Sequence, residues 1–441
     1  MPSHSAAWWW LLGKEWRELV ASRAWWVMLV VMGPLIGFAF ISAVRTYAEA
    51  SGLNGTAAGV GEAFSPLVGI WAPTFSACEL AAAFLLPFVG IRLVAGDRQS
   101  GALKLELQHA MPAALRVAAK AVVLFAGWIV ASAPAALAVV LWRSYGGSVY
   151  APELATVAAG HLMNAGLTIG LAAAAASMTE HPSTAAILTL SVTVGTWILN
   201  FIAAVQGGVW ERVARYTPTA MVAEFQHGLI RVDVVVAAVA LVVSGLALAA
   251  VWMRLGVPVR RRVGESFALA AVAVAVITAG TLATTSWDTS ESRRNSFSRA
   301  DEAALAGIRG PITIEVHLAP EDPRRVDLEH RALSKLRRVR PDLHVRYVSA
   351  TSIGLFEQTS ASYGEIWYDV QGRKAVSRSI TAEALLETLY SLAGVTPPGE
   401  DDDATFRGRP LMARPTGAAT VFYVFWPALV VGAAVVAKGT G

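Results

Sequence analysis

Polar side chains inside long apolar runs are the residues of this sequence whose chemistry most needs an explanation. Glu79, His161, Asn164 and Asn200 each lie within a stretch that is otherwise almost wholly apolar. A charged or strongly polar group in hydrocarbon is costly, so such groups line a pathway for a substrate or form hydrogen bonds between helices. Both roles remain open for Glu79, which lies roughly 12 Å inside its run at about 1.5 Å per residue.

The sequence carries no pattern for catalysis or for a resident metal. The single cysteine, Cys78, lies in an apolar run and allows neither a disulfide within the chain nor a CxxC pair. His317 and His344 are interpreted as surface histidines, because no Cys, His or carboxylate stands at ligand spacing from them. An intramembrane hydrolase is disfavoured, since no HExxH motif and no recognisable serine or aspartate pair occurs in the apolar runs. We therefore predict no catalytic residue, no metal site and no enzymatic activity in this chain.

Composition places the chain among membrane proteins. Of its 441 residues, 55% are hydrophobic and 15% are charged, and the mean hydropathy is +0.50. Continuous apolar runs, rather than alternating ones, indicate helices and not a barrel. The runs able to cross roughly 30 Å of hydrocarbon are Ala24–Val44, Trp71–Ala95, Ala121–Trp142, Leu154–Met178, Ser183–Val205, Val232–Met253, Ser266–Thr285 and Gly417–Ala437. We predict an α-helical polytopic protein of eight spans.

The basic residues of the short loops predict the orientation. With a cytoplasmic N-terminus, that side holds Lys14, Arg17, Arg23, Arg92, Arg98, Lys104, Arg116, Lys120, Arg254, Arg260, Arg261, Arg262 and Lys438. The other side holds Arg45, Arg143, Arg212, Arg215 and Arg231. This excess predicts that both termini are cytoplasmic and that residues 286–416 lie outside the membrane on the opposite, extracytoplasmic side. The N-terminal region is expected to be retained, because Lys14 and Glu15 interrupt any signal-peptide core.

Residues 1–23 predict a helix that lies in the membrane interface on the cytoplasmic side. One helical face carries Trp9, Leu12, Trp16, Leu19 and Val20, and the other carries Lys14, Glu15, Arg17 and Glu18. The tryptophans also fit an aromatic belt, and the two interpretations are compatible.

Residues 286–396 predict a small α/β domain. Ser298 to Asp301 resembles a capping box that starts a short helix, which would end near Gly307. Alternation of apolar and polar residues predicts strands at Ile312–Leu318 and Leu343–Val348, with a helix at Leu328–Val339 between them. A third strand at Glu365–Val370 and a closing helix at Thr381–Ala393 follow, and residues 397–416 are expected to form a linker.

The charged segment between the second and third apolar runs resembles a family motif. The run from Gly96 to Leu103 reads GDRQSGAL and is similar to the E/D-R-x-x-G-x-L loop of ABC-2-type transporter permeases, and Met111, Pro112 and Lys120 resemble its continuation. The resemblance implies a six-span permease domain at 24–255, a basic loop and a seventh span at 256–285, and an eighth span with its tail at 417–441. It also implies that the loop holds a coupling helix for an ATPase subunit, with contacts from Asp97, Arg98, Gly101, Leu103, Leu105, Leu107, Met111 and Pro112.

The extracytoplasmic domain carries a second resemblance. The segment from Asp288 to Ser298 is similar to the juxtamembrane segment of the auxiliary component of gliding-motility-type ABC transporters, and Pro311–Leu318 is similar to the strand that follows it. Phe297 stands where that family usually has Leu, and the domain is much shorter than in the family. Only the first portion of the family's domain is therefore expected here.

The source of energy is expected to lie outside this chain. The sequence has no G-x-x-x-x-G-K-[ST] loop to hold phosphates, and although Lys14 and Lys438 follow glycines, neither has the rest of the motif. ATP and Mg²⁺ would then be bound by a separate ABC ATPase subunit, and the chain itself is expected to need no cofactor. The resemblance implies a homodimer of half-transporters in the inner (cytoplasmic) membrane.

The predicted function is the permease subunit of an ATP-driven exporter. Glu79, His161, Asn164 and Asn200 are the candidates for its pathway, and the segment Trp210–Ile230 resembles the family's outer re-entrant helices, with Tyr216, Pro218 and Phe225 closing the outer end. The extracytoplasmic domain would recruit substrate or an envelope protein, and no nucleic acid is expected to bind. The alternative is a mechanotransmission subunit that moves no solute and passes ATP-driven motion to the extracytoplasmic domain.

Overall fold

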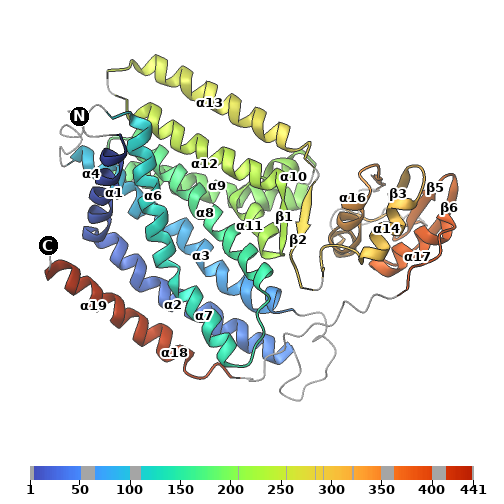
Figure 1. The fold of residues 1–441 in the computed structure, drawn as a ribbon. Helices are drawn as coiled ribbons and strands as arrows, with labels where there is room; N and C mark the ends of the chain where they lie inside the picture. Colours follow the sequence, from blue (N-terminus) through green and yellow to red (C-terminus); the bar gives the residue numbers. More distant parts are fainter. Residues whose placement is uncertain are drawn as a thin grey trace, which may run out of the picture.

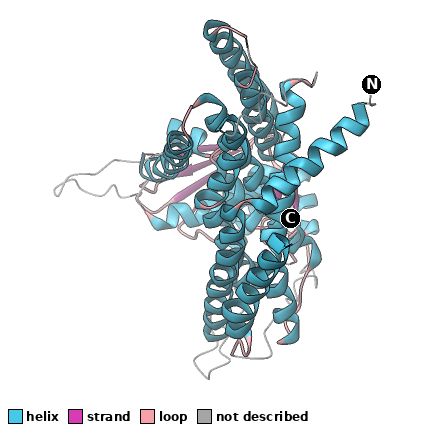
Figure 2. Cartoon of the chain, turned by 90° about the vertical axis from the view of Figure 1, so that its left-hand side faces the viewer, coloured by secondary structure: helices cyan, strands magenta, loops and turns pink. Residues whose placement is uncertain are grey.

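The protein consists of a helical bundle and a smaller domain of mixed helices and strands (Figure 1). The computed structural model describes residues 4–50, 65–99, 111–206, 208–254, 256–283, 285–291, 293–319, 322–348, 362–399 and 414–439. Both termini lie at one end of the bundle, here called the termini end, which faces the viewer in Figure 2. The smaller domain lies beyond the opposite end, here called the domain end (Figure 1).

Eight helices of the described part are long and apolar enough to cross a membrane, as the sequence predicted. They run over Arg23–Glu49, Leu67–Gly96, Ala113–Ser144, Ala151–Met178, Pro182–Gln206, Val232–Trp252, Val259–Gly280 and Ala418–Gly439. The bundle elements are α1 (His4–Ala21), α2 (Arg23–Ala50), the π-helix η2 (Leu67–Trp71), α3 (Ala72–Phe84), α4 (Leu86–Gln99), α6 (Ala113–Ala131), α7 (Ala133–Ser144), α8 (Ala151–Met178), α9 (Pro182–Gln206), α10 (Val209–Ala214), α11 (Pro218–Gln226), α12 (Val232–Trp252), α13 (Val259–Gly280), α18 (Ala418–Thr420), the π-helix η5 (Val421–Phe425) and α19 (Trp426–Gly439). The chain is thus a multi-pass helical membrane protein.

The third span begins two turns earlier than the apolar run suggests. Pro112 is extended, with φ −62° and ψ 145°, and serves as the N-cap residue, so α6 begins at Ala113. Arg116 and Lys120, which the sequence analysis counted as loop charges, therefore lie within the helix and are buried. Hydropathy placed the boundary at Ala121, because it cannot recognise a basic residue that is neutralised by a partner from another helix.

The face of α1 that packs against the bundle includes one residue that the sequence placed on the polar side. Leu11, Glu15 and Leu19 are buried, whereas Trp9 is 70% exposed and Trp16 is 37% exposed. The spacing of four residues that joins the three buried positions is that of one helical face. The sequence placed Glu15 on the polar side, and its burial follows from an ion pair described below.

Small residues let the helices at the centre of the bundle approach closely. α8 packs against α3, α4, α6, α9, α11 and α12. Where α8 crosses α12, a Cβ atom added to Gly245 would lie only 2.8 Å from the carbonyl carbon of Gly170. Glycine is required at such crossings because two backbones meet there.

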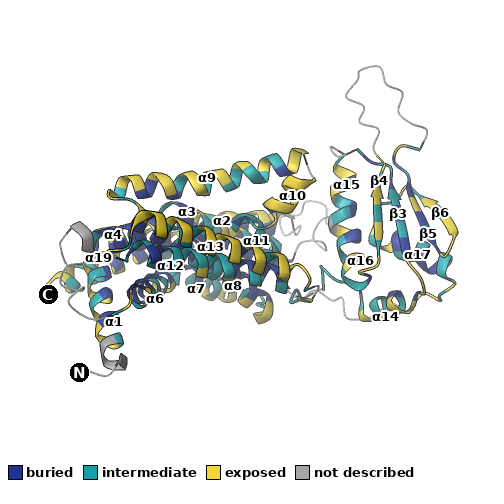
Figure 3. Cartoon of the chain, turned by 90° about the horizontal axis from the view of Figure 1, so that it is seen from above, coloured by how far each residue is buried: buried dark blue, intermediate teal, exposed yellow. Residues whose placement is uncertain are grey.

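Two helices at the edge of the bundle connect it to the smaller domain. α13 packs on α12 and leads into the domain, and α19 packs on α2 and returns from it. Figure 3 shows that α9 and α13 expose much of their surface. At Gly37 and Gly33, an added Cβ would lie 2.3 Å and 2.2 Å from Phe422 and Trp426 respectively. These two glycines of α2 therefore allow the eighth span to pack closely against the first.

The smaller domain contains a four-stranded mixed sheet. Its elements are α14 (Arg299–Gly307), β3 (Ile312–Val316), α15 (Pro323–Leu328), the π-helix η3 (Glu329–Leu333), α16 (Ser334–Val339), β4 (His344–Tyr347), β5 (Ile366–Val370), β6 (Arg373–Ser377) and α17 (Ala382–Ala393). The strand order is β4-β3-β5-β6, with β3 and β4 parallel and the other two pairs antiparallel. A separate two-stranded pair, β1 (Leu229–Arg231) with β2 (Ser286–Asp288), lies between the bundle and this domain.

Alternating burial in β3 builds the core of the domain. Ile312, Ile314 and Val316 are fully buried, and they pack with leucines from α15, α16 and α17. The predicted cap of α14 is confirmed, because Ser298 Oγ accepts a hydrogen bond from Asp301 N at 3.0 Å. Strand β6 was not predicted, although the Gln-Gly pair before it, with φ of 55° and 82°, forms the tight turn of a hairpin.

The two histidines of the domain differ in their surroundings. His344 is exposed on β4, as predicted. His317 follows β3 and is half-buried, with its ring centroid 5.5 Å from that of Trp367. The aromatic side chain of β5 therefore covers part of the His317 ring, which was predicted at the surface.

Replacement of Gly37 by Ala should loosen the eighth span. The new methyl group would overlap Phe422, so we expect a loss of stability of about 1–3 kcal/mol, typical of overpacking. Unfolding by denaturant in detergent measures the effect. Gly195→Ala in α9 is the control, because nothing lies within 4 Å of the added atom. Equal stability of the two variants would contradict the close contact of α2 with η5.

Candidate functional site

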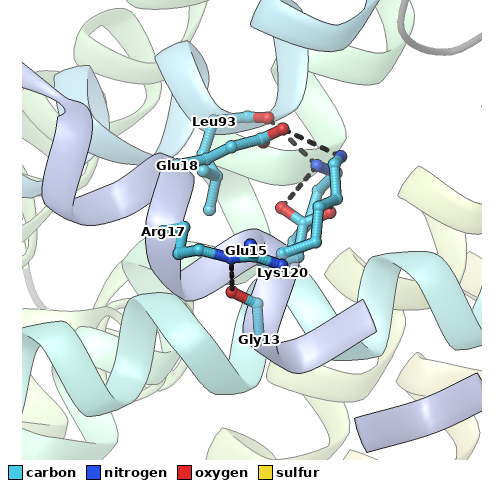
Figure 4. Close-up of polar contacts among 7 residues, drawn as sticks. Gly13, Glu15, Arg17, Glu18, Leu93 and Lys120 are labelled. Atoms are coloured by element: carbon cyan, nitrogen blue, oxygen red, sulfur yellow. Dashed lines mark hydrogen bonds and ion pairs between the residues drawn. The ribbon is translucent and has the colours of Figure 1, made fainter. Parts of the chain in front are cut away.

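A buried ion pair joins three helices at the termini end. Lys120 Nζ of α6 lies 2.7 Å from Glu15 Oε2 of α1, and it donates a second hydrogen bond to the Leu93 carbonyl of α4 at 3.2 Å (Figure 4). The Lys120 side chain is 2% exposed and that of Glu15 is 0% exposed. Lys14 Nζ approaches the other oxygen of Glu15 at 3.2 Å. Two cations thus flank one buried carboxylate.

Close packing continues this junction along α6. An added Cβ at Gly127 would lie 2.6 Å from Leu19 of α1, and the Trp25 indole donates a hydrogen bond to the Gly127 carbonyl at 3.4 Å. α1 also contacts α2 and α4. The surface helix and the first three spans are therefore held together at this end of the bundle.

The predicted coupling loop leaves the bundle beside this ion pair. Asp97 and Arg98 lie in the last turn of α4, and Pro112 caps α6, whereas Met111 is half-buried just before it. Gly101, Leu103, Leu105 and Leu107 lie outside the described residues. Lys120 belongs to α6, donates a hydrogen bond to Leu93 of α4 and pairs with Glu15 of α1. These three helices are therefore linked to one another next to the two ends of the loop.

The candidate pathway residues converge on α11. Gln226 Nε2 lies 3.2 Å from His161 Nε2 of α8 and donates to Ser76 Oγ of α3 at 3.3 Å. Glu79 is half-buried on α3 and lies near Thr219 of α11. These contacts connect two of the four predicted residues to one short helix.

Asn200 reaches the same helix from α9, while Asn164 lies in the interior. Thr217 Oγ1 donates to Asn200 Oδ1 at 2.8 Å, and Thr217 is also the N-cap residue of α11. Asn164 is 5% exposed on α8. Sequence reasoning missed Thr217 and Gln226, because polar residues of a short helix outside the apolar runs give no hydropathy signal. It also missed Ser76, which lies within the second apolar run.

The predicted outer gate forms two short helices, α10 and α11, at the domain end. Pro218 occupies the first position of α11, and Tyr216 before it is half-buried. Phe225 is 4% exposed and packs over Gly160 of α8, where an added Cβ would lie 2.5 Å from it. The side chains of α11 thus cover the polar residues of α3 and α8.

The chain passes from α11 directly into a joint with the smaller domain, here called the outer junction (β1, β2 and residues 289–291 and 293–295). β1 pairs with β2 in antiparallel register, Ile230 opposite Trp287. Thr289 Oγ1 lies 2.8 Å from Thr156 Oγ1 of α8, and Glu153 at the start of α8 accepts a hydrogen bond from Glu291 N at 2.7 Å. The outer junction therefore contacts both the gate helix and the central helix of the bundle.

Asp288 organises the outer junction. Its carboxylate accepts from Ser290 N at 3.0 Å and Ser290 Oγ at 2.5 Å, and from Asn295 N at 2.9 Å and Asn295 Nδ2 at 3.3 Å. Burial lowers the pKa of Lys335 and of Arg338 on α16, and the negative charge of Asp288 opposes that shift for both. One carboxylate thus shapes the joint, and its charge also acts on the basic residues of α16.

Comparison with known proteins gave no match, either to a protein-family model, to a curated protein or to a solved structure.

Replacement of Glu15 by Leu should cost more stability than replacement of Lys120 by Met. Glu15→Leu leaves the Lys120 ammonium buried without the Glu15 carboxylate, a change that costs about 3–5 kcal/mol. Lys120→Met leaves Glu15 beside Lys14, so the loss should be smaller, and the double variant should recover most of it. Denaturant unfolding of the single and double variants in detergent measures the interaction free energy between Glu15 and Lys120.

Glu18→Gln is the matched control. Its carboxylate is 37% exposed and pairs with Lys14 at 3.1 Å, so its loss should change stability by about 1 kcal/mol or less. Additive effects of the Glu15 and Lys120 replacements would contradict the proposed pairing.

Replacement of Asp288 by Ala should weaken the outer junction. Four donors lose their acceptor, and a loss of about 1–3 kcal/mol is expected for unsatisfied groups. Limited proteolysis should then cut near residues 289–295 faster than in the wild type. Asp327→Ala is the control, because Asp327 forms only a long, exposed ion pair with Arg331 at 3.8 Å. Unchanged cleavage of the Asp288 variant would show that other contacts hold the joint.

Proposed function

We propose that this chain is the membrane-spanning subunit of an ATP-driven exporter of the ABC-2 type, with ATP hydrolysis in a separate subunit. The observation that carries the proposal is the buried ion pair between Glu15 and Lys120, with its bond to the Leu93 carbonyl. A force applied to the loop between α4 and α6 would be transmitted to both helices and to α1 together. Rigid attachment of this kind is what an ATPase needs to move spans as a unit.

The ATPase would bind at the termini end, on the cytoplasmic side of the inner membrane. The excess of basic residues at that end supports this orientation. Asp97, Arg98, Leu103, Leu105 and Leu107 would form the contact, with the apolar side chains entering a cleft of the ATPase. ATP and Mg²⁺ would stay on the partner.

A second copy of the chain would complete the pathway. Ser76 is exposed and Glu79 is half-buried on α3, and Gln226 of α11 is half-buried beside them. Polar and ionisable groups on the surface of a span need a protein partner or water, because lipid tails offer no hydrogen bonds. If these polar faces of two copies of the chain lined a shared pathway, its water would form hydrogen bonds with the polar groups. The α11 helices would then close the outer end of the pathway.

A mechanotransmission subunit is the second candidate, and the outer junction favours it. The hydrogen bonds of Thr289 and Glu291 to α8 connect the bundle to the smaller domain. Tilting of α8 would therefore move that domain even without a solute in the pathway. In this case the domain would act on an envelope protein.

The proposal that the loop between α4 and α6 contacts an ATPase is tested by purifying the chain together with that ATPase. The first candidate for the ATPase is the product of an adjacent reading frame. Leu103→Asp combined with Leu105→Asp should lower permease-stimulated ATP hydrolysis at least about tenfold, because the two new charges would have to enter an apolar contact. A tenfold loss corresponds to about 1.4 kcal/mol of binding free energy. Val326→Asp, at a 51% exposed site of the smaller domain, should have no effect. Unchanged assembly and turnover in the double variant would reject the assignment.

A disulfide across the outer junction and a substitution at Glu79 together test the two candidates. Thr156→Cys with Thr289→Cys, in a Cys78→Ala background, places two thiols where hydroxyls lie 2.8 Å apart. For a transmitter, the covalent link replaces the hydrogen bond, so ATP hydrolysis in the oxidised protein should still move the smaller domain, as read by a fluorescent pair on β6 and α13. For an exporter, Glu79→Gln should reduce ATP-dependent solute flux in vesicles, and flux that persists at the wild-type level would exclude Glu79 from the pathway.

A further inference from the structure

An apolar groove lies on the outside of the bundle between the first and the eighth span. It is lined by Trp26, Val30 and Val31 of α2 and by Val431, Ala434 and Lys438 of α19. Its volume is about 320 Å³, within the range of roughly 300–1,000 Å³ that small-molecule sites occupy. α2 and α19 lie side by side at the edge of the bundle (Figure 1), so the groove faces the surrounding membrane.

The packing of α19 explains why the groove opens only toward the termini end. Near the middle of α2, Gly33 and Gly37 allow the closest approach, and the Trp426 indole donates a hydrogen bond to the Leu29 carbonyl at 2.7 Å. From Gly33 toward the termini end, valines replace the glycines on α2, at Val31, Val30 and Val27. Branched side chains hold the helices apart, so the space between them widens.

Basic side chains stand at the open end of the groove. Lys438 lines it and is exposed, and Arg23 is exposed one helical turn before Trp26. The Trp26 indole donates a hydrogen bond to the Val20 carbonyl at 2.6 Å, a position typical of aromatic residues at the membrane interface. The site thus combines an apolar channel with positive charge at headgroup depth.

We propose that this groove binds an anionic phospholipid, with one acyl chain between α2 and α19 and the phosphate beside Lys438 and Arg23. The apolar lining accepts a hydrocarbon chain, and the two cations select a negative headgroup over a zwitterionic one. The bound lipid would fill the gap that the valines leave and would hold α19, the returning span of the smaller domain, against α2. This site depends on neither the ATPase nor the pathway.

Native mass spectrometry of the full chain in mild detergent tests the proposal. Phosphatidylglycerol and phosphatidylcholine with the same acyl chains are offered at equal concentration. The wild type should retain phosphatidylglycerol about fivefold more than phosphatidylcholine, and Lys438→Ala should lose about that factor. Ala434→Trp, which fills the groove, should abolish retention of both, and Ala434→Leu, a smaller change, should reduce it.

Matched variants control for charge and bulk. Arg260→Ala removes an exposed cation at the start of α13, and Ala433→Trp adds the same ring on a part of α19 that does not line the groove; neither should alter lipid retention. Equal retention of the two lipids, or retention that survives both Ala434 replacements, would overturn the proposal. Disulfide cross-linking of two copies through Val431→Cys in a Cys78→Ala background would overturn it as well, because a second chain would then occupy the groove.

Discussion

The burial of one ion pair sets the architecture of the termini end. Lys120 could not lie 2% exposed inside a helix bundle without a partner, because an isolated buried charge is costly. Glu15 supplies that partner only if α1 packs across α6 with its Leu11, Glu15 and Leu19 face inward. The position of the surface helix, the early start of α6 and the link to the Leu93 carbonyl all follow from this requirement.

A second centre lies at the opposite end, on the nine residues of α11. Polar side chains of α3, α8 and α9 each find a hydrogen-bonding partner at Thr217 or Gln226. The chain then continues into β1 and the outer junction, where Asp288 holds the turn that enters the smaller domain. Motion of the spans and motion of that domain are thus connected by short covalent and hydrogen-bonded paths. The proposed exporter and the proposed transmitter would use the same path and differ in what it moves.

Local patterns predicted much of the fold. Hydropathy located all eight spans because each is long enough to be recognised alone, and alternation located β3, β4 and β5 because one face of each is buried. The same approach misplaced the start of α6, placed the buried Glu15 on the polar side of α1 and missed β6. In each case the deciding contact came from another part of the chain: Glu15 for Lys120, α6 for α1, and β5 for β6.

The sequence by itself determined that the chain is a membrane protein with eight helical spans and a small α/β domain before the last, since burial of apolar side chains in lipid depends on composition over a window of about 20 residues. It also indicated which polar side chains need an explanation. Only the tertiary structure decided how they are satisfied: Lys120 by Glu15, His161 by Gln226, and Asn200 by Thr217. These pairings join residues from different helices, and hydrogen bonds depend on distance and direction in space, which a linear pattern does not contain.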